Sequence, residues 1–344
     1  MGSVVSQAGL HAEPKTWCVT GAAGFIGSHL TEALLKEGQR VIGLDNLATG
    51  YRANLDDVRQ RVGEGAWQRF SFVEGDIRHF DTCRRITEAA DLVLHQAALG
   101  SVPRSIADPL ATHSANVDGF LNMLTAARDA GIRRFVYASS SSVYGDHPGL
   151  PKVEDTIGTP LSPYAVSKRI DELYARTFAD HYGMETVGLR YFNVFGPRQD
   201  PNGAYAAVIP KWIGQLLDGE TPTINGDGET SRDFCFVLNV VQANLRAALA
   251  PNEATGTVYN VAVGDRTTLR ELYELIASEL EGLRPGWQAP RPALGPFRAG
   301  DVRHSLADVS RAQDAFGYEP LCGIREGMVT TTKWFARELV EKET

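Results

Sequence analysis

Short apolar runs alternate, along the first half of the chain, with longer segments in which apolar residues recur at helical spacing. The runs are predicted to be buried strands at residues 16–20, 41–44, 70–73, 92–95, 135–139 and 186–190. Helical patterns follow the first run through residue 35 and also cover residues 119–130 and 163–182. Strands that alternate with helices predict an α/β fold, in which helices cover both faces of a doubly wound parallel sheet.

The pattern changes after about residue 191, where loops rich in Pro, Gly and Asn alternate with shorter elements. We therefore expect an N-terminal arm over residues 1–14, a cofactor-binding domain over residues 15–191, and a smaller α/β domain over residues 192–344 that mainly binds substrate. Residues 234–250 have the pattern of a strand and a helix that could return to the first layer.

Composition narrows the possible partners. The chain of 344 residues is 43% hydrophobic, enough for a substantial core, and its 34 basic and 42 acidic residues give a formal net charge of −8. This charge argues against nucleic acid or an anionic membrane as the main partner. No apolar run approaches the roughly 20 residues that span a bilayer. The four cysteines are widely spaced, so we expect neither a metal site nor a disulfide, and a reducing cytoplasm is the expected compartment.

A glycine-rich turn lies between the first predicted strand and the first predicted helix, with glycines at Gly21, Gly24 and Gly27. They permit a tight turn and a close approach of the backbone to a pyrophosphate, although a plain turn could use them too. Asp45 ends the second strand, where it could accept hydrogen bonds from the adenosine ribose and would repel a 2′-phosphate. This favours NAD over NADP, while Arg52 nearby and a simple turn role for Asp45 are the arguments against.

A tyrosine and a lysine four residues apart, Tyr164 and Lys168, follow a Ser-Pro pair that is typical of a helix start. They share a helix face. An ammonium and an oxidised nicotinamide nearby would favour ionisation of a phenol, whose pKa is ordinarily near 10. A run of serines lies upstream, at the carboxyl end of a predicted strand, where open α/β sheets bind ligands. The catalytic candidates are Tyr164, Lys168, Ser140, Ser141 and Ser142.

The glycine spacing, with two residues in each gap, resembles that of the extended short-chain dehydrogenase/reductases, which have a Rossmann-type fold. The resemblance implies that the turns after the third and fourth strands contact the adenine and the nicotinamide ribose, and that Asn116 is a structural and catalytic asparagine. The implied NAD-binding residues are Gly21, Gly24, Phe25, Ile26, Gly27, Asp45, Asn46, Asp76, Ile77, Gln96, Ala97, Ala98, Asn116, Tyr164, Lys168 and Tyr191.

The serine run also bears on the reaction. Sugar-nucleotide dehydratases of this family usually have an Asp-Glu pair in this loop, whereas this chain has Ser141 and Ser142. Without a carboxylate for elimination, we expect reversible oxidation and reduction at C4 of a UDP-sugar. Tyr164 would accept the C4 hydroxyl proton while hydride passes to NAD. A dehydratase and a non-catalytic NAD-binding protein are disfavoured, the second because Tyr164 and Lys168 are both present.

Residues 95–105, 145–151 and 199–207 resemble the UDP-N-acetylglucosamine 4-epimerases of bacterial surface-polysaccharide pathways. In that group arginines matching Arg232 and Arg298 hold UDP, and an acid matching Asp301 holds its ribose. Ser305 matches a position at which epimerases that reject acetamido sugars have tyrosine, so its small side chain implies room for an N-acetyl group. The implied substrate-binding residues are Gly100, Ser101, Ser140, Ser142, Tyr164, Asn193, Gln199, Ala207, Val208, Asn225, Arg232, Arg298, Asp301 and Ser305.

The predicted activity is therefore C4 epimerisation of a UDP-N-acetylhexosamine, with UDP-glucose and UDP-galactose as further candidate substrates. Close relatives also include epimerases of UDP-N-acetylhexosaminuronic acids, which need a cation or donor for a C6 carboxylate. Arg104 is a candidate for that role or for a structural one. The family usually dimerises by packing two helices of each subunit into a four-helix bundle, which implies a homodimer formed by helices near residues 119–130 and 163–182.

Overall fold

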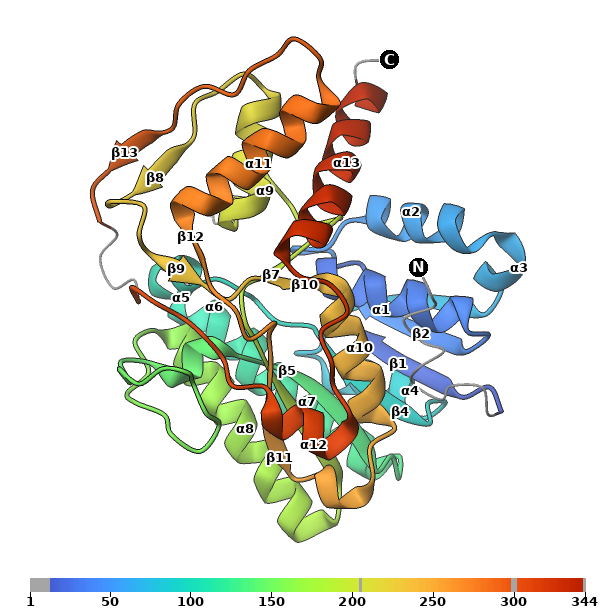
Figure 1. Ribbon diagram of the computed structural model, residues 1–344. Helices are drawn as coiled ribbons and strands as arrows, with labels where there is room; N and C mark the ends of the chain where they lie inside the picture. The colour runs from blue at the N-terminus through green and yellow to red at the C-terminus, as the bar shows by residue number, and fades with distance from the viewer. Residues whose placement is uncertain (1–12, 204–205, 298–301, 343–344) are drawn as a thin grey trace.

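The computed structural model describes residues 13–203, 206–297 and 302–342. Its centre is a parallel sheet in the strand order β11-β6-β5-β4-β1-β2-β3 (Figure 1). The strands are β1 (Thr16–Thr20), β2 (Arg40–Asp45), β3 (Phe70–Glu74), β4 (Leu92–His95), β5 (Arg134–Ser140), β6 (Glu185–Tyr191) and β11 (Thr257–Val261). The strand order reverses at β1 and β4, and open α/β sheets bind ligands at the carboxyl ends of such strands.

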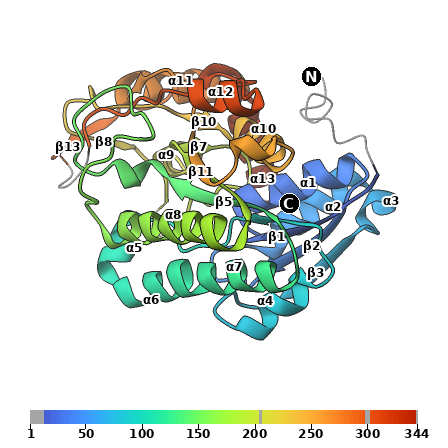
Figure 2. The same ribbon diagram turned by 90° about the horizontal axis from the view of Figure 1, so that it is seen from below.

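Helices cover both faces of this sheet, which confirms the predicted doubly wound α/β fold (Figure 2). One face is covered by α1 (Phe25–Lys36) and α10 (Val237–Ala248), with α2 (Arg52–Val62) and α3 (Glu64–Trp67) beside α1. The other face is covered by α4 (Phe80–Thr87), α7 (Gly119–Asp129) and α8 (Pro163–Tyr182). The first six strands end within one residue of their predicted bounds, because each is a buried apolar run.

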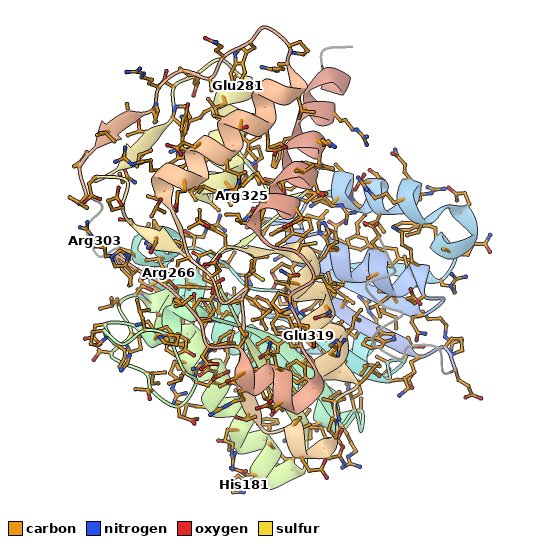
Figure 3. All side chains as sticks on the ribbon, viewed as in Figure 1. His181, Arg266, Glu281, Arg303, Glu319 and Arg325 are labelled. Atoms are coloured by element: carbon orange, nitrogen blue, oxygen red, sulfur yellow. The ribbon has the colours of Figure 1, made fainter. Side chains whose placement is uncertain are left out.

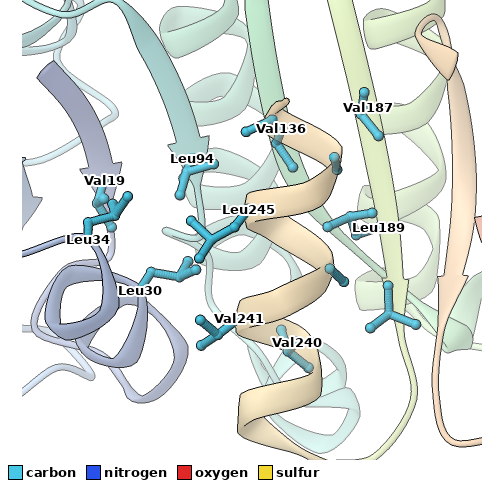
Figure 4. Close-up of a cluster of buried hydrophobic side chains, with 14 of the residues drawn as sticks. Val19, Leu30, Leu34, Leu94, Val136, Val187, Leu189, Val240, Val241 and Leu245 are labelled. Carbon is cyan, nitrogen blue, oxygen red and sulfur yellow. The ribbon is translucent and has the colours of Figure 1, made fainter. Parts of the chain in front are cut away.

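Aliphatic side chains fill the space between the sheet and the helices α1 and α10 (Figure 4). Leu30 and Leu34 lie four residues apart on α1, as Val241 and Leu245 do on α10, so each pair shares one helix face. All four side chains are fully buried, and burial of each contributes about 1.5–3 kcal/mol. The return of α10 to this layer therefore fixes the carboxyl ends of β4, β5 and β6 relative to the glycine-rich turn.

Aromatic side chains occupy the opposite face of the sheet. The ring of Phe120 on α7 lies edge-on to the rings of His95, at 5.5 Å, and Tyr137, at 5.2 Å. Burial, and to a smaller extent the nearby Lys168 ammonium, lower the pKa of His95 to about 3. His95 is consequently neutral at physiological pH and packs as part of the apolar core.

The remaining elements form a smaller lobe and the links to it. In this lobe α9 (Val208–Leu217), α11 (Leu269–Leu283) and α13 (Ile324–Lys342) pack around a second core. Its short strands pair as β7 (Val194–Phe195) with β10 (Cys235–Phe236), β8 (Thr223–Asn225) with β13 (Ala293–Gly295), and β9 (Ser231–Arg232) with β12 (Thr267–Thr268). The other elements are α5 (Val102–Ala107), α6 (Pro109–His113), η1 (Ser114–Asp118), η2 (Ser141–Tyr144), η3 (Asn252–Ala254) and α12 (Ser310–Phe316).

Two segments that follow residue 191 nevertheless belong to the sheet layer, since α10 covers β4, β5 and β6 while β11 pairs with β6. The predicted domain boundary at residue 191 remains a prediction. Within the described ranges, no helix is both long and apolar enough to cross a membrane.

Candidate active site

The glycine-rich turn adopts the tight conformation that the sequence predicts. Gly21 has a φ of 69°, in the left-handed region that favours glycine. A Cβ at Gly27 would lie 2.0 Å from the carbonyl oxygen of Gly21, so no side chain fits there without displacing backbone. Gly24 caps α1 without a side-chain hydrogen bond, which leaves the N-terminal end of α1 and its positive dipole facing the turn. The turn, which lacks side chains at its glycines, and the backbone nitrogens at the start of α1 fit a pyrophosphate.

Two carboxylates lie beside the turn. Asp45 accepts hydrogen bonds from the backbone nitrogens of Ala23, at 3.0 Å, and Leu47, at 2.8 Å. Burial raises the pKa of Asp45 in opposition to these bonds. Asp76 accepts hydrogen bonds from the Asn46 side chain, at 2.8 Å, and from the Arg78 guanidinium, which with its neighbours lowers the pKa of Asp76. Asp45 is thus placed beside the turn, where an adenosine ribose would be expected.

Beyond the turn, the predicted nicotinamide side is held by a buried polar network. Tyr191 donates to Gln96 Oε1 at 3.0 Å and accepts from Asn244 Nδ2 at 2.8 Å, while Gln96 Nε2 donates to Asn244 Oδ1 at 3.0 Å. The hydroxyl of Thr20 accepts from the backbone nitrogens of Gln96, at 3.2 Å, and Ala97, at 3.1 Å. Asn244 comes from α10, and neither it nor Thr20 was predicted from the sequence. The network fixes the turn of Gln96, Ala97 and Ala98 at the end of β4.

Asn116 lies in the π-helical turn η1, and its amide is fully used within the protein. Its Oδ1 accepts from the backbone nitrogen of Leu99 at 2.7 Å, and its Nδ2 donates to the Leu99 carbonyl at 3.2 Å and to the Ser167 hydroxyl at 3.1 Å. Asn116 therefore ties the loop after β4 to α8. Ile77, another predicted cofactor residue, is buried against Gly119 of α7.

The helix α8 positions the Tyr164 and Lys168 pair. The Ser162 hydroxyl caps its first turn by accepting from the Ala165 nitrogen at 3.2 Å. Tyr164 is half-buried in that turn. The Lys168 ammonium donates to the Ala138 carbonyl at 2.9 Å and to Asp171 Oδ2 at 3.1 Å. Asp171, a buried carboxylate beside the candidate catalytic lysine, was not predicted from the sequence.

The serine run divides into two parts. Ser140 Oγ accepts from both the nitrogen, at 3.1 Å, and the hydroxyl, at 2.9 Å, of Ser142. Ser139 donates to Glu172 of α8 at 2.7 Å and is buried. Ser141 and Ser142 therefore face a cavity, whereas Ser139 serves the contact between β5 and α8.

This cavity has a volume of about 920 Å³ and lies between the sheet and the smaller lobe. Ten of the predicted site residues line it: Ser101, Ser141, Ser142, Asn193, Gln199, Ala207, Val208, Asn225, Arg232 and Ser305. Gly100, Ser140 and Tyr164 are not among the lining residues, and Arg298 and Asp301 lie outside the described residues. The charged side chains that the described wall contains are Lys152, Lys211 and Arg232, and it contains no Asp or Glu. The wall thus favours an anionic ligand.

Three arginines lie near His304, the neighbour of the lining residue Ser305, and one of them, Arg232, lines the cavity. Burial lowers the pKa of His304, and the charges of Arg266, Arg303 and Arg232 lower it further. Figure 3 shows Arg266 and Arg303 on the side of the molecule where β9 and β12 lie. Planar guanidinium groups suit a diphosphate. Sequence reasoning missed Arg266 and Arg303, although Arg303 lies between two predicted site residues.

Residues 198–200 connect the two halves of the site. Arg198 is buried with a φ of 64°, and its guanidinium donates to Asp57 of α2 at 2.7 Å and to Glu32 of α1. Asp200 accepts from the hydroxyl of Tyr51, in the loop after β2, at 2.6 Å. Gln199, between them, lines the cavity. The segment that borders the cavity is therefore anchored to the helices around the glycine turn.

The model of the NAD dependent epimerase/dehydratase family matches residues 17–262 of the chain, which include the glycine turn and the Tyr164 and Lys168 pair. The chain belongs to this family.

Individual members of the family are similar over nearly the whole chain. A UDP-glucose 4-epimerase of Mycolicibacterium smegmatis is 39% identical over 92% of this chain and 97% of its own length. The structure of a UDP-N-acetylglucosamine 4-epimerase from Methanobrevibacter ruminantium, in complex with UDP-N-acetylmuramic acid, is 39% identical, has a TM-score of 0.86, and covers 94% of this chain and 99% of its own. A Thermus thermophilus UDP-glucose 4-epimerase in complex with NAD is 34% identical, has a TM-score of 0.80, and covers 93% and 99% of the two chains.

As a family member, the protein is an NAD-dependent enzyme, and its site residues fit this cofactor. The glycine-rich turn admits a pyrophosphate, and Asp45 presents an anion at the end of β2, which suits ribose hydroxyls and opposes a 2′-phosphate. The cavity with its basic wall begins where the serine run and the first turn of α8 meet. The arrangement can hold a dinucleotide and a sugar nucleotide end to end.

Proposed function

We propose that this protein interconverts the C4 epimers of UDP-N-acetylhexosamines, with UDP-glucose and UDP-galactose as further candidate substrates. The coarser part of this proposal, a UDP-sugar 4-epimerase that uses NAD, is supported by relatives named as UDP-sugar 4-epimerases, one of them solved with NAD, within a family of NAD-dependent epimerases and dehydratases. The finer part, the acetamido sugar, rests on the cavity.

The observation that supports the acetamido sugar is the position of Ser305 on the cavity wall. Its backbone nitrogen donates to the Ser231 carbonyl at 3.1 Å, in the segment that also contains Arg232. A serine here leaves open the volume that a tyrosine ring would fill. Since the diphosphate is expected at Arg232, the first sugar ring would lie within reach of Ser305, and its 2-acetamido group would have room.

The proposed mechanism assigns one task to each group. Arg232 binds the diphosphate, and Ser140 and Ser142 hydrogen-bond the C4 oxygen. Tyr164 accepts the C4 hydroxyl proton and later returns it, and Lys168 stabilises the phenolate in between. NAD, when bound, supplies the hydride acceptor and donor at C4. The enzyme must retain the nucleotide while the 4-keto sugar turns over, for which a cavity of about 920 Å³ offers space.

The wall of the cavity also bears on the competing reaction. Loss of water from a sugar requires a group that moves a proton at a second carbon, and a carboxylate usually does this. Among the described lining residues there is no carboxylate, and Ser141 and Ser142 occupy the loop where dehydratases have an acidic pair. This supports epimerisation over dehydration.

The test is to incubate the purified protein, without added NAD, with UDP-N-acetylglucosamine, UDP-glucose and UDP-N-acetylglucosaminuronic acid separately. Anomeric proton NMR follows each 4-epimer. We expect the acetylated hexosamine to be converted by wild type and not by Tyr164→Phe. Ser305→Tyr should lose conversion of the acetylated sugar and keep that of UDP-glucose. No epimer from any of the three sugars, even after NAD is supplied, would refute the proposal.

A second candidate substrate is a UDP-N-acetylhexosaminuronic acid, and the observation that favours it is Lys152 on the cavity wall. This lysine is only 4% exposed, its ammonium donates to the His147 carbonyl, and burial lowers its pKa. A C6 carboxylate could pair with it. Arg104 is not among the lining residues, so the structure favours Lys152 for this role. Lys152→Met should then lower kcat/KM on the uronate far more than on the neutral sugar.

We also propose that the protein forms a homodimer. Apolar side chains are exposed on adjoining helices: Ile106 of α5, Leu110 of α6, and Val166 and Leu173 of α8, with exposed fractions of 43% to 82%. Exposed apolar patches of this kind commonly mark interfaces. A four-helix bundle would cover these side chains. Sedimentation of wild type and of Leu110→Glu tests the proposal, and a monomeric wild type would refute it.

A further inference from the structure

A buried carboxylate, that of Asp171, lies next to the candidate catalytic lysine, on the side away from Tyr164. Asp171 Oδ2 is 3.1 Å from the Lys168 ammonium, and the two side chains are only 1% and 3% exposed. Asp171 Oδ1 is buried and has no hydrogen-bond partner among the described residues. The pair is therefore shielded from water, and the charge of one side chain acts strongly on the other.

The three groups form a line along α8. Tyr164 precedes Lys168 by four residues and Asp171 follows it by three, so all three lie on one helix face. A rise of 1.5 Å per residue puts Asp171 roughly 10 Å from Tyr164 along the helix axis, with Lys168 between them. The Lys168 ammonium is also fixed by the Ala138 carbonyl at 2.9 Å. Its position is thus set by β5 on one side and by Asp171 on the other.

The other titratable groups near Lys168 either have a partner of opposite charge or are kept neutral by burial. Glu172, the neighbour of Asp171, is bound by Arg190 of β6. Burial, and then the charges of Glu172 and Asp171, raise the pKa of Tyr137 on β5, and burial keeps His95 on β4 neutral. Asp171 is consequently the carboxylate that balances the Lys168 ammonium.

We propose that Asp171 is a positioning residue that holds the Lys168 ammonium and sets the pH range in which the enzyme works. The inference rests on the proposed function, in which Tyr164 accepts the substrate proton. An ionised Asp171 holds the Lys168 ammonium in place and offsets part of the positive charge that stabilises the Tyr164 phenolate. Burial raises the pKa of Asp171 and the Lys168 ammonium opposes that shift, so the charge of Asp171 depends on how closely the two side chains are held together.

In Asp171→Asn the negative charge that disfavours ionisation of Tyr164 is absent. Tyr164 should therefore ionise at lower pH than in wild type. The acid limb of the pH profile of kcat should consequently move toward acid, by roughly half to one pH unit for a charge about 10 Å from Tyr164.

The experiment measures kcat and KM against pH for wild type, Asp171→Asn and the smaller neutral variant Asp171→Ser. Asp180→Asn is the matched control, because Asp180 lies on the same helix in an exposed pair with Arg176 and should leave the profile in place. The content of bound NAD and the melting temperature show that each variant is folded. A profile that loses height without moving, as a merely structural role predicts, would overturn the proposal, and so would a shift toward alkali.

A second readout needs no sugar turnover. The ultraviolet difference absorbance of phenolate, taken between each protein and its Tyr164→Phe counterpart, reports the ionisation of Tyr164 alone. A titration that moves toward acid in the Asp171 variants supports the proposal even if no sugar is epimerised, in which case the proposed function alone fails. An unmoved titration overturns the proposal whatever the activity.

Discussion

The contact between α8 and β6 depends on a buried ion pair, and its removal should be costly. Arg190 donates to Glu172 through Nε at 2.8 Å and Nη2 at 2.9 Å, and both side chains are at most 2% exposed. Ser139 also donates to this carboxylate. Glu172→Gln keeps the size of the side chain, removes its charge, and turns an amide NH₂ toward guanidinium donors.

The size of the stability loss depends on which contacts the Arg190 guanidinium keeps in the variant. The variant leaves the Arg190 guanidinium buried with the bond of Nη1 to the Glu154 carbonyl at 2.9 Å, the ring of Tyr144 at 4.9 Å and one uncharged amide oxygen, but with no counter-ion among the described residues. Removing one partner of a buried pair costs about 3–5 kcal/mol, because the other charge stays uncompensated. A protein of this kind has a total stability of only about 5–15 kcal/mol. We therefore expect Glu172→Gln to lose roughly a fifth or more of the free energy of unfolding.

Urea unfolding at saturating NAD, followed by tryptophan fluorescence, measures this loss. Arg176→Gln is the control, since its pair with Asp180 on the same helix is exposed and is worth less than about 1 kcal/mol. The difference between wild type and Glu172→Gln should also depend on pH. Burial alone would raise the pKa of Glu172, but Arg190 outweighs it and lowers the pKa, so the stabilisation is present above about pH 4.3 and is lost as the pH falls further.

A loss in Glu172→Gln no larger than that in Arg176→Gln would refute the reasoning. It would mean that the desolvation of the two charges already cancels their attraction, so that the pair fixes geometry without adding stability.

Three further outcomes are expected. His29 is buried on α1, and burial first and the Arg198 charge second lower its pKa to about 3, so the stability that the neutral ring contributes is lost as the pH falls below about 6.5. From pH 7 to pH 5, wild type should lose about 2 kcal/mol more of its free energy of unfolding than His29→Gln does. Urea unfolding measures both losses, and equal losses would contradict this prediction. Gly27→Ala must displace the Gly21 carbonyl, so the Kd for NAD, measured by titration of the cofactor-free protein, should rise at least about tenfold, which ~1.4 kcal/mol produces. An unchanged Kd would show that the turn can relax. Arg232→Gln should raise KM for the UDP-sugar about tenfold or more, as expected for lost charged hydrogen bonds, with bound NAD unchanged; loss of NAD instead would place Arg232 in the wrong half of the site.

Features that depend on neighbours along the chain could be predicted from the amino-acid sequence. The first six strands, the turn from Gly21 to Gly27 and the helix of Tyr164 and Lys168 were all predicted correctly. Buried strands are short apolar runs, a tight turn needs glycine, and a helix start needs a capping side chain. Each requirement acts over fewer than about ten residues, so it is visible in a single sequence.

Which distant groups meet, and which of them lose contact with water, became visible only in the folded chain. Asn244 reaches Gln96 across 148 positions, and Arg198 reaches Glu32 across 166, with no local pattern to indicate either contact. β11 has three apolar residues, as β3 does, but only its pairing with β6 places it at the edge of the main sheet. Asp171 is three residues from Lys168 in any helix, but its importance comes from burial, since the same pair in water would be worth little. Desolvation depends on everything that packs around a group, and a sequence read along one dimension does not contain that information.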